Sequence, residues 1–584
     1  VLGVLWGVSA LFFSNLLRGG PWQVLVIVAT ALVGVATAWV GWLLLRHAWF
    51  RHRLSCFSTP PAHSWLMGHL GQMRDSEEGL LDVDSLVRTH GHSCSWFLGP
   101  FYHLVRVFHP DFTNPLLKAA GQSLLISNGE EWSRRRRLLT PAFHFDVLKG
   151  YVAVFNNATH TMHSKWMRLS SEGQRDLEMF QHMGLMTLDS LLRCAFSHSS
   201  DCQETSNEFT TAILELGDLI MDRRRTIPHH WDCIYWRSAQ GKRFRRATEV
   251  VHSDLSLYCL TPYPLLNDLS LYCLTPYPLL SDLSLYCLTP YPLLSDLSLF
   301  TRRVVEHRRA LIRTQSPRES PEGAARGGTA GDTAQRQKRK DFIDIILLAQ
   351  GEEGGGLTDK EVEAEANTFM FAGHDTTASA ICWTLFNLAG HAHYQDRCRD
   401  EVKELMRDRA EQDIKWADLS SMPFTTMCIK ESLRLHSPVL AVTRQYTRDV
   451  DLPGNRTVPK GAICLVSIYG THHNPAVWSD PNEFNPLRFD PANTRERSSN
   501  AFIPFSSGPR NCIGQRFAMA ELQVAVALTL LRFRLSLGSN PDTAGTSTGQ
   551  GIRRLPQLVL RAEGGMWLRL ELLDPPCTEG LHAQ

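Results

Sequence analysis

The segment from Val24 to Leu45 contains no charged residue. It is long enough to cross the hydrocarbon core of a bilayer as one helix, and longer than the apolar part of an ordinary cleaved signal peptide. Arg46, Arg51 and Arg53 follow it closely, whereas Arg18 alone precedes it, so the positive-inside rule predicts that the downstream chain faces the cytosol. We therefore interpret residues 24–45 as a transmembrane anchor, because a buried core helix, the alternative, would not need these flanks.

The anchor divides the 584-residue chain into unequal parts. Residues 1–23 are a further apolar extension whose role the sequence leaves open. Residues 46–65 are first basic and then proline-rich, which predicts a stiff linker. We expect one large domain from 66 to 575, followed by a tail at 576–584.

Charge and cysteine content exclude several classes of function. The 60 basic and 59 acidic residues nearly cancel, so no overall positive field favours nucleic acid as a partner. No two of the 14 cysteines lie closer than eight residues, which excludes C-x-x-C zinc or thioredoxin motifs and a compact disulfide framework. The composition fits reduced thiols in a domain that faces the cytosol.

Helical periodicity dominates the large domain. Apolar residues recur three and four apart in residues 132–139, 183–192, 361–388, 396–406, 425–435 and 518–531. Strand-like segments are short and few: a hairpin over Trp96–Phe108 and pieces at 462–468 and 558–560. The fold class we predict is mainly α with small β sheets.

A tandem repeat interrupts this pattern. The 14-residue unit DLSLYCLTPYPLLN starts at Asp254 and recurs twice with small changes before a truncated copy. Two prolines per unit forbid a continuous helix, and without residues 253–299 the flanking sequences join into one amphipathic helix. We interpret these residues as an insert, either a translated tandem repeat or an artefact of gene prediction, in preference to a functional array. Small and charged residues dominate the segment 316–340, and this composition predicts a mobile loop.

The stretch FMFAGHDTTAS is unusual for the middle of a long helix. Gly373, Asp375 and Thr376 all weaken helices and pack no apolar core. Thr358 and Glu361 predict a capping box at the start of this helix. Polar side chains can take over backbone hydrogen bonds, and a glycine lets a ligand approach, so we expect a functional bulge, with a kinked core helix as the alternative.

Cys512 lies in the segment PFSSGPRNCIGQRF, directly ahead of a long helix with an apolar face. Backbone N–H groups at the start of that helix, together with Arg510, are expected to lower the pKa of the thiol. No histidine or second cysteine lies at zinc-ligand spacing, so the pattern indicates an iron centre held by one sulfur. An inert buried cysteine is the alternative.

This segment resembles the haem-binding signature of the cytochrome P-450 monooxygenases, F-x-x-G-x-R-x-C-x-G. The matching residues are Phe505, Gly508, Arg510, Cys512 and Gly514. The resemblance implies the P-450 fold, with haem b between the long central helix and the cysteine loop, and with Cys512 as the axial ligand of the iron.

Two further motifs of that family occur in the right order. E-x-x-R is matched by Glu431 and Arg434, whose spacing places them on one helix face, and F-x-P-x-R-F is matched by residues 484–489. The resemblance implies that Arg488 joins Glu431 and Arg434 in a structural triad behind the haem.

The resemblance also implies haem contacts and an oxygen-binding side. Positions that match haem-propionate contacts are held by Trp132, Arg136, Arg444 and Arg510. Gly373 would make room for dioxygen, Thr376 would hydrogen-bond it, and Asp375 would pass protons inward. The arginines of the run 134–137 that do not face haem are candidates for contact with an acidic reductase.

Within the family, the chain resembles family 4 and its F subfamily, whose members hydroxylate fatty acids and eicosanoids such as leukotrienes. The stretches TPAFHFDVLKGY, TMCIKESLRLHSPV and GTHHNPAVW are among those that carry this resemblance. Many family 4 enzymes have a glutamate, esterified to a haem methyl, where this chain has Ala372. We therefore expect non-covalent haem apart from the Cys512–iron bond, and hydroxylation of in-chain carbons as well as the terminal methyl. The loop from Pro110 to Trp132 is short for the family, which leaves the identity of the lipid substrate open.

No G-x-G-x-x-G opens a strand–helix unit and no P-loop occurs, so electrons must come from outside. The resemblance implies NADPH through a membrane flavoprotein reductase, with cytochrome b5 as a further candidate partner, at the endoplasmic reticulum membrane. Two alternatives stay open. A haem-thiolate isomerase or lyase should not need the acid and alcohol of Asp375 and Thr376, and a non-catalytic membrane protein could result from the insert and the short loop.

Overall fold

The structure, a computed structural model, describes most of the chain. The described residues are 21–118 except 70 and 73, 129–197, 202–204, isolated positions between 215 and 229, 232–253, 342–348, 357–539 except 410 and 411, and 552–573. The first 20 residues of the N-terminal extension, the repeats after Ser253, the loop 316–340, residues 119–128 of the short loop and the tail lie outside them.

Helices dominate the described residues, as the sequence predicts. The longer helices are α2 (Pro21–Arg53), α3 (Glu77–His90), α5 (Gly129–Leu139), α6 (Phe145–Ser171), α7 (Met179–Phe196), α10 (Ala239–Ser253), α13 (Asp359–Gly390), α14 (Ala392–Met406), α15 (Pro423–Leu435) and α18 (Gln515–Arg532). The short helices are α4 (Pro110–Lys118), α9 (Asp232–Tyr235), α12 (Phe342–Leu348), α16 (Ile468–His472) and α17 (Pro491–Thr494), with 3₁₀ turns at Thr140–Phe143, Trp416–Ser421, Pro486–Phe489 and Ser499–Ala501.

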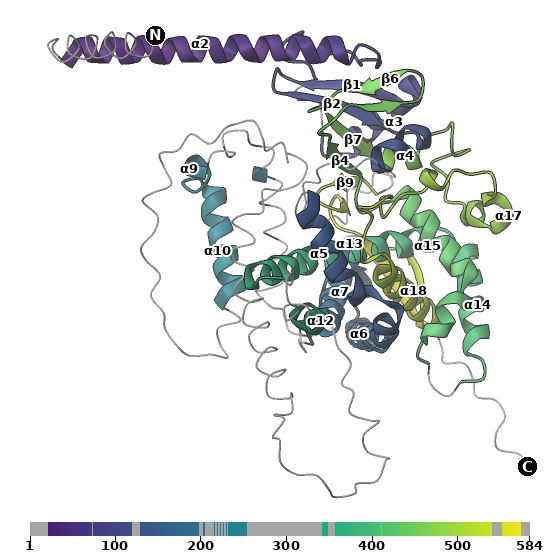
Figure 1. The fold of residues 1–584 in the computed structure, drawn as a ribbon. Coiled ribbons are helices and arrows are strands. Elements are labelled where there is room, and N and C mark those ends of the chain that lie inside the picture. Colours follow the sequence, from purple (N-terminus) through teal and green to yellow (C-terminus); the bar gives the residue numbers. More distant parts are fainter. Residues whose placement is uncertain are drawn as a thin grey trace, which may run out of the picture.

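The long helix α13 runs through the middle of the molecule (Figure 1) and packs against α7, α15 and α18. Its first turn shows the predicted capping box: the Thr358 backbone N–H donates to Glu361 Oε2 over 2.7 Å, and the Glu361 N–H donates back to Thr358 Oγ1 over 3.3 Å. One core cluster includes Met370 and another includes Trp383, so α13 contributes to both. This central position lets the helix present residues to a site inside the fold.

The strands form four small sheets. They are β1 (Ser93–Leu98), β2 (Tyr102–Val107), β3 (Asp176–Glu178), β4 (Ala441–Gln445), β5 (Val450–Leu452), β6 (Arg456–Val458), β7 (Ile463–Ser467), β8 (Phe533–Leu537), β9 (Arg554–Pro556), β10 (Leu560–Ala562) and β11 (Trp567–Leu572). The largest sheet has the order β1-β2-β7-β4, with β2 parallel to β7. The predicted hairpin is confirmed, since β1 pairs antiparallel with β2 and Gly99 turns between them at a φ of 62°.

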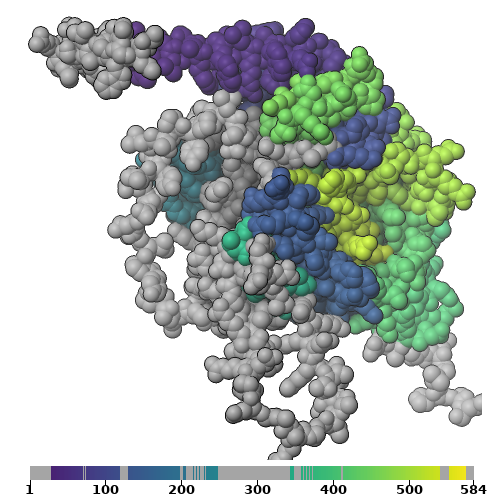
Figure 2. Space-filling model, viewed as in Figure 1, coloured from purple at the N-terminus to yellow at the C-terminus, as the bar shows by residue number. Residues whose placement is uncertain are grey.

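The N-terminal helix α2 has two different halves. Residues Val28–Arg53 are long and apolar enough to cross a membrane, with a mean hydropathy of 2.0, and the helix projects from the body of the molecule (Figure 2). At the C-terminal end of α2, Phe50 is buried against the β1–β2 sheet, and so are Leu54 and Phe57, which follow the helix. The predicted linker therefore differs from the structure in its first part, because residues 46–53 continue the helix, and apolar side chains there hold it to the domain.

Candidate active site

The loop that carries Cys512 has a tightly constrained backbone. The Cys512 N–H donates to the carbonyl oxygen of Phe505 over 2.9 Å. Ser506 and Gly508 adopt left-handed conformations, with φ of 59° and 75°. A Cβ atom on Gly508 would lie 2.4 Å from the carbonyl oxygen of Leu117, so only glycine fits at this position. The loop thus holds the thiol at one place just ahead of α18.

The Cys512 thiol is accessible, yet enough protein surrounds it for burial to raise its pKa. A backbone hydrogen bond from Gly514 and the positive charge of Arg136 act in the opposite direction and do not overcome burial. The expected fall in pKa is therefore wrong, and the cation that acts on the sulfur is Arg136, not Arg510. Because a bound metal deprotonates a ligating thiol outright, this cysteine suits metal ligation better than nucleophilic chemistry.

Arginine and tryptophan side chains surround the same loop. Arg136 donates through Nη1 and Nη2 to the carbonyl and side-chain oxygens of Asn511, both at 2.9 Å. The Arg510 guanidinium lies 4.2 Å from the ring centroid of Trp132. Burial and the positive charge of Arg444 lower the pKa of Arg510 to about 10. Two guanidinium groups that repel each other favour an anionic ligand, such as the two carboxylates of a haem.

The other arginines of the 134–137 run bind the central helix. Arg134 pairs with Glu361, and Arg135 lies 3.2 Å from Glu365 and 3.3 Å from Glu361. Burial raises the pKa of Glu365, whereas the adjacent Arg135 lowers it. These two arginines are therefore committed to joining α5 to α13, and only the exposed Arg137 stays a candidate for contact with a reductase.

One face of α13 is accessible in the middle of the helix. Ala372 is exposed and Thr376, one turn later, is partly exposed, whereas the intervening His374 is buried. The Thr376 hydroxyl donates to the Ala372 carbonyl oxygen over 2.8 Å, and the Thr377 hydroxyl makes the equivalent bond to Gly373. The helix is continuous here, so the expected bulge is absent from it, and the hydroxyls add to the helical hydrogen bonds without replacing them.

Gly373 and Asp375 face other partners. A Cβ atom on Gly373 would lie 3.2 Å from Leu191 Cδ2, so the missing side chain permits close packing of α13 on α7. Asp375 Oδ1 accepts a hydrogen bond from Arg561 Nη2 over 2.7 Å, as an ion pair with β10. Sequence reasoning missed Arg561, because nothing local links two residues so far apart in the chain.

Aromatic contacts connect the α13 face to the cysteine loop. A Cβ atom on Gly514 would lie 3.9 Å from the Cys512 sulfur and 3.8 Å from the Phe143 ring. The Phe143 ring in turn stacks on Phe369 of α13, with centroids 5.4 Å apart. The thiol and the Ala372–Thr376 face therefore border one region, and an accessible thiol with nearby arginines is a donor set that fits haem.

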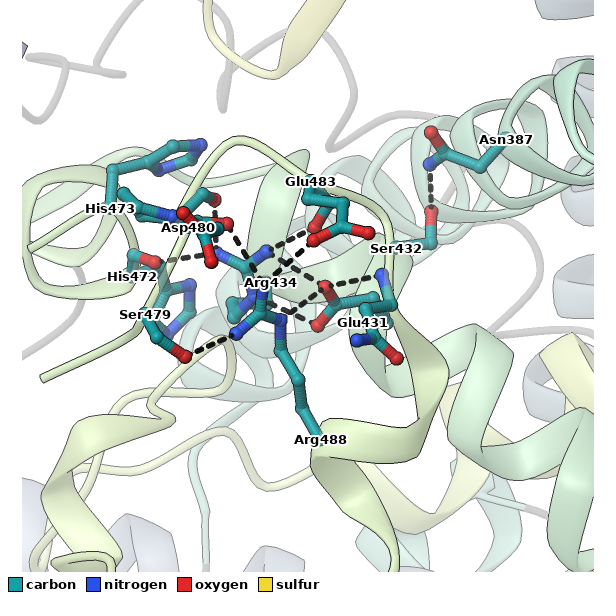
Figure 3. Close-up of polar contacts among 12 residues, drawn as sticks. Asn387, Glu431, Ser432, Arg434, His472, His473, Ser479, Asp480, Glu483 and Arg488 are labelled. Atoms are coloured by element: carbon teal, nitrogen blue, oxygen red, sulfur yellow. Dashed lines mark hydrogen bonds and ion pairs between the residues drawn. The ribbon is translucent and has the colours of Figure 1, made fainter. Parts of the chain in front are cut away.

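The three residues of the predicted triad meet in the core (Figure 3). Arg434 binds Glu431 through two hydrogen bonds of 2.8 Å, with both side chains fully buried. Arg488 approaches the same carboxylate, with Nε 3.3 Å from Oε1. Arg434 also donates to the carbonyl oxygens of His472, Pro481 and Glu483, so a single arginine connects α15 to the later segment from His472 to Glu483.

Comparison with known proteins decides the family. The sequence profile of the Cytochrome P-450 family matches residues 59–257 and 293–559. The chain belongs to the cytochrome P-450 family. It is 44% identical to human Cytochrome P-450 4F3 over 96% of this chain and 98% of that protein. It is 46% identical to mouse Cytochrome P-450 4F3 over 89% and 90% of the two chains, and 44% identical to the human ultra-long-chain fatty acid omega-hydroxylase over 90% of each.

Family membership establishes the type of chemistry. This cytochrome P-450 is of the family 4, subfamily F type, a monooxygenase in which a cysteine ligates haem iron, with electrons from NADPH through a reductase. The apolar helix α2 fits a membrane-anchored member of the family. The isomerase or lyase alternative and the non-catalytic alternative are not favoured by these similarities.

Proposed function

We propose that this cytochrome P-450 hydroxylates long-chain fatty acids or eicosanoids at or near the terminal methyl group. The observation that supports this most directly is the 44% identity, over 90% of each chain, with an enzyme named for omega-hydroxylation of ultra-long-chain fatty acids. The ring of Phe342 packs on both Phe143 and Phe369, with centroids 5.9 and 4.4 Å away, and this apolar cluster beside the cysteine loop is compatible with a hydrocarbon substrate.

In this proposal Cys512 holds the haem iron, while Trp132, Arg136, Arg444 and Arg510 contact the propionates. The bound haem would supply activation of dioxygen and transfer of one oxygen atom to a C–H bond. The hydroxyl of Thr376 is a candidate for moving a proton on the accessible face of α13, and in this structure it donates a hydrogen bond to the Ala372 carbonyl oxygen. Asp375, held by Arg561, could relay protons only when that ion pair opens.

Ala372 bears on how the haem is held and on which carbon reacts. Its methyl side chain, exposed on the face of α13, has no carboxylate that could form an ester with the haem. We infer that the haem is held only by the cysteine bond and non-covalent contacts, and that the freedom this leaves permits reaction at in-chain carbons. Strictly terminal products would contradict the second part of this inference.

The cellular setting belongs to the same proposal. The arginines at the end of α2 favour a catalytic domain on the cytosolic face of the endoplasmic reticulum membrane, where the reductase is available and cytochrome b5 could act as a second electron donor. The profile match omits residues 258–292, inside the repeats, which supports the interpretation of residues 253–299 as an insert.

The test is a reconstitution of the full-length protein with NADPH, a flavoprotein reductase and saturated fatty acids of increasing chain length. We expect hydroxylated products that require NADPH, with loss of both the products and the thiolate-type carbon monoxide spectrum in Cys512→Ser. A protein that shows this spectrum but gives no product with any fatty acid or leukotriene would contradict the proposed substrate class. Products formed from a lipid peroxide without NADPH would instead support the isomerase alternative.

A further inference from the structure

His472 is the last residue of α16 and is completely buried. Its carbonyl oxygen accepts the 2.8 Å hydrogen bond from Arg434 Nη1, and its ring faces the segment that begins the cysteine loop. We propose that His472 is a positioning residue that fastens the Cys512 loop to the buried Glu431–Arg434 ion pair. The proposal rests on Cys512 being the iron ligand.

The hydrogen bonds of the His472 ring define one tautomer. The backbone N–H of Ile503 donates to Nε2 over 2.9 Å, so Nε2 must be the unprotonated nitrogen. Nδ1 then carries the proton and donates to Ser437 Oγ over 3.0 Å, and the Ser437 hydroxyl donates onward to the Leu433 carbonyl oxygen over 2.5 Å. Every proton in this series has one acceptor, which makes the arrangement directional and rigid.

The electrostatics keep His472 in the form that this geometry needs. Burial, together with the positive charge of Arg434, lowers the pKa of the ring to about 3. The ring is therefore neutral at physiological pH, and Nε2 stays available as an acceptor. A protonated ring would present an N–H to the N–H of Ile503 and would release the loop.

Ile503, at the start of the loop, packs against Leu117, Val466 and Ile468, and the ring of His472 supplies the acceptor for its backbone N–H. Ile503 is buried, so its N–H would lose its partner if the ring of His472 were removed, and no solvent could replace it. The carbonyl oxygen of Ile503 accepts from the Ser506 N–H over 3.0 Å, and the Phe505 carbonyl accepts from Cys512. A shift of Ile503 would therefore move Ser506 and Phe505, and with Phe505 the hydrogen-bonded Cys512.

The neighbouring histidine provides a matched control. His473 is equally buried, but its Nδ1 bonds to the carbonyl oxygen of Tyr469 in the preceding turn, and its Nε2 has no hydrogen-bond partner within the described chain. Its ring stacks on Tyr469, with centroids 4.0 Å apart. Its replacement perturbs packing to a similar extent without touching the cysteine loop.

The experiment compares full-length holoenzymes that carry His472→Leu, His472→Gln and His473→Leu. Two readouts are used: the ratio of thiolate-ligated to thiolate-lost protein in the reduced carbon monoxide spectrum, and the reduction potential of the iron. We expect H472L to lower that ratio by on the order of tenfold, the equilibrium shift that loss of one buried hydrogen bond produces. Glutamine carries an acceptor and a donor like the ring, so H472Q should restore most of the ratio, and H473L should leave it unchanged.

Equal losses in H472L and H473L, or no rescue by H472Q, would show that His472 only fills space and would overturn the proposal. If H472L does not fold, Ser437→Ala supplies the test, because it removes only the hydroxyl that accepts the Nδ1 proton. S437A is expected to lower the same ratio less than tenfold and to change the reduction potential. An unchanged ratio and potential in S437A would also overturn the proposal.

Discussion

Cys512 shows how single residues in this site depend on partners that the protein places around them. Its pKa is raised by burial, and Arg136 and the Gly514 N–H reduce that rise without reversing it. In the proposed haem site, deprotonation of the thiol is therefore coupled to binding of the iron. At the residue scale, the fold fixes the position of the Cys512 sulfur, whereas the cofactor determines its charge.

Ala372 supports a prediction about the haem linkage. Ala372→Glu would place a carboxylate on the exposed face of α13, at the position where the family resemblance implies an esterified glutamate in many family 4 enzymes. We expect acid–organic extraction to remove essentially all haem from the wild-type protein and to leave a measurable fraction on A372E after turnover with NADPH and reductase. Ala372→Gln has the same size without the carboxylate and serves as the control. Retention of haem by A372Q, or by the wild type, would contradict the prediction.

Glu521 supports a prediction about pH. It is buried in α18 and contacts the Ser190 hydroxyl, which also donates to the Thr187 carbonyl oxygen. Serine has one proton to donate, so both contacts are satisfied together only when Glu521 is protonated. Burial is the cause that raises its pKa from 4.5 to about 8.

The direction in which stability changes with pH follows from proton binding by Glu521. Between about pH 4.5 and 8 the folded state holds a proton that the unfolded state releases, so the contribution of Glu521 to stability is complete below pH 4.5 and is lost as pH rises to about 8. Glu521→Gln should remove this dependence, and its stability advantage over the wild type should be larger at pH 8 than at pH 5. Urea unfolding at the two pH values measures it, and an advantage independent of pH would refute the assignment.

At the scale of elements, the contact between α5 and α13 positions the side chains of α5 that we propose as haem contacts. Arg135 is 13% exposed and lies between Glu361 and the buried Glu365, and Trp132 and Arg136 occupy the same short helix. The ion pairs therefore determine where the residues that face the Cys512 loop lie, although they have no place in the chemistry themselves.

Arg135→Leu tests this contact. It leaves Glu365 buried without its cation, and breaking such a pair costs about 3 to 5 kcal/mol of unfolding free energy. Arg137→Leu, exposed on the same helix, should change stability by less than about 0.5 kcal/mol. Urea unfolding of both variants, with haem content as a second readout, measures the difference. Equal effects of the two variants would show that α5 does not depend on this ion pair.

At the scale of the whole molecule, α2 combines two environments in one helix. Its first half is apolar on all sides and projects from the domain, whereas Phe50 packs in the core with residues of the β1–β2 sheet. An anchor attached in this way restricts the orientation of the domain relative to the membrane more than a free linker would. This restraint follows from the burial of residues just after the hydrophobic span.

The repeat supports a prediction at the same scale. α10 ends at Ser253, directly before the repeats, and the family profile does not match residues 258–292. Deletion of residues 253–299 should join the flanking amphipathic sequences and leave the haem site intact, since none of its residues lies in the deleted segment. We expect the deleted chain to bind at least as much haem per protein as the full chain, measured by the reduced carbon monoxide spectrum. Loss of that spectrum on deletion would contradict the interpretation of these residues as an insert.

The sequence alone determined those features whose information lies within one segment. The capping box of α13, the β1–β2 hairpin, the span of α2 and the motif around Cys512 depend on spacings of a few residues, and the structure shows the expected local geometry for the first two. The E-x-x-R spacing likewise predicts that Glu431 and Arg434 share a helix face, where they meet. Short-range periodicity and turn chemistry act before any tertiary contact forms, so they can be recognised without one.

Only the tertiary structure decided the partners and the charge states. Arg561 for Asp375, the ring of His472 for Ile503, and Leu191 for Gly373 come from segments that no local pattern connects. The direction of the Cys512 pKa was wrong from sequence, because burial depends on how many atoms of distant segments surround a group, and desolvation outweighs one helix terminus. Packing brings these groups together, and packing is a property of the whole fold.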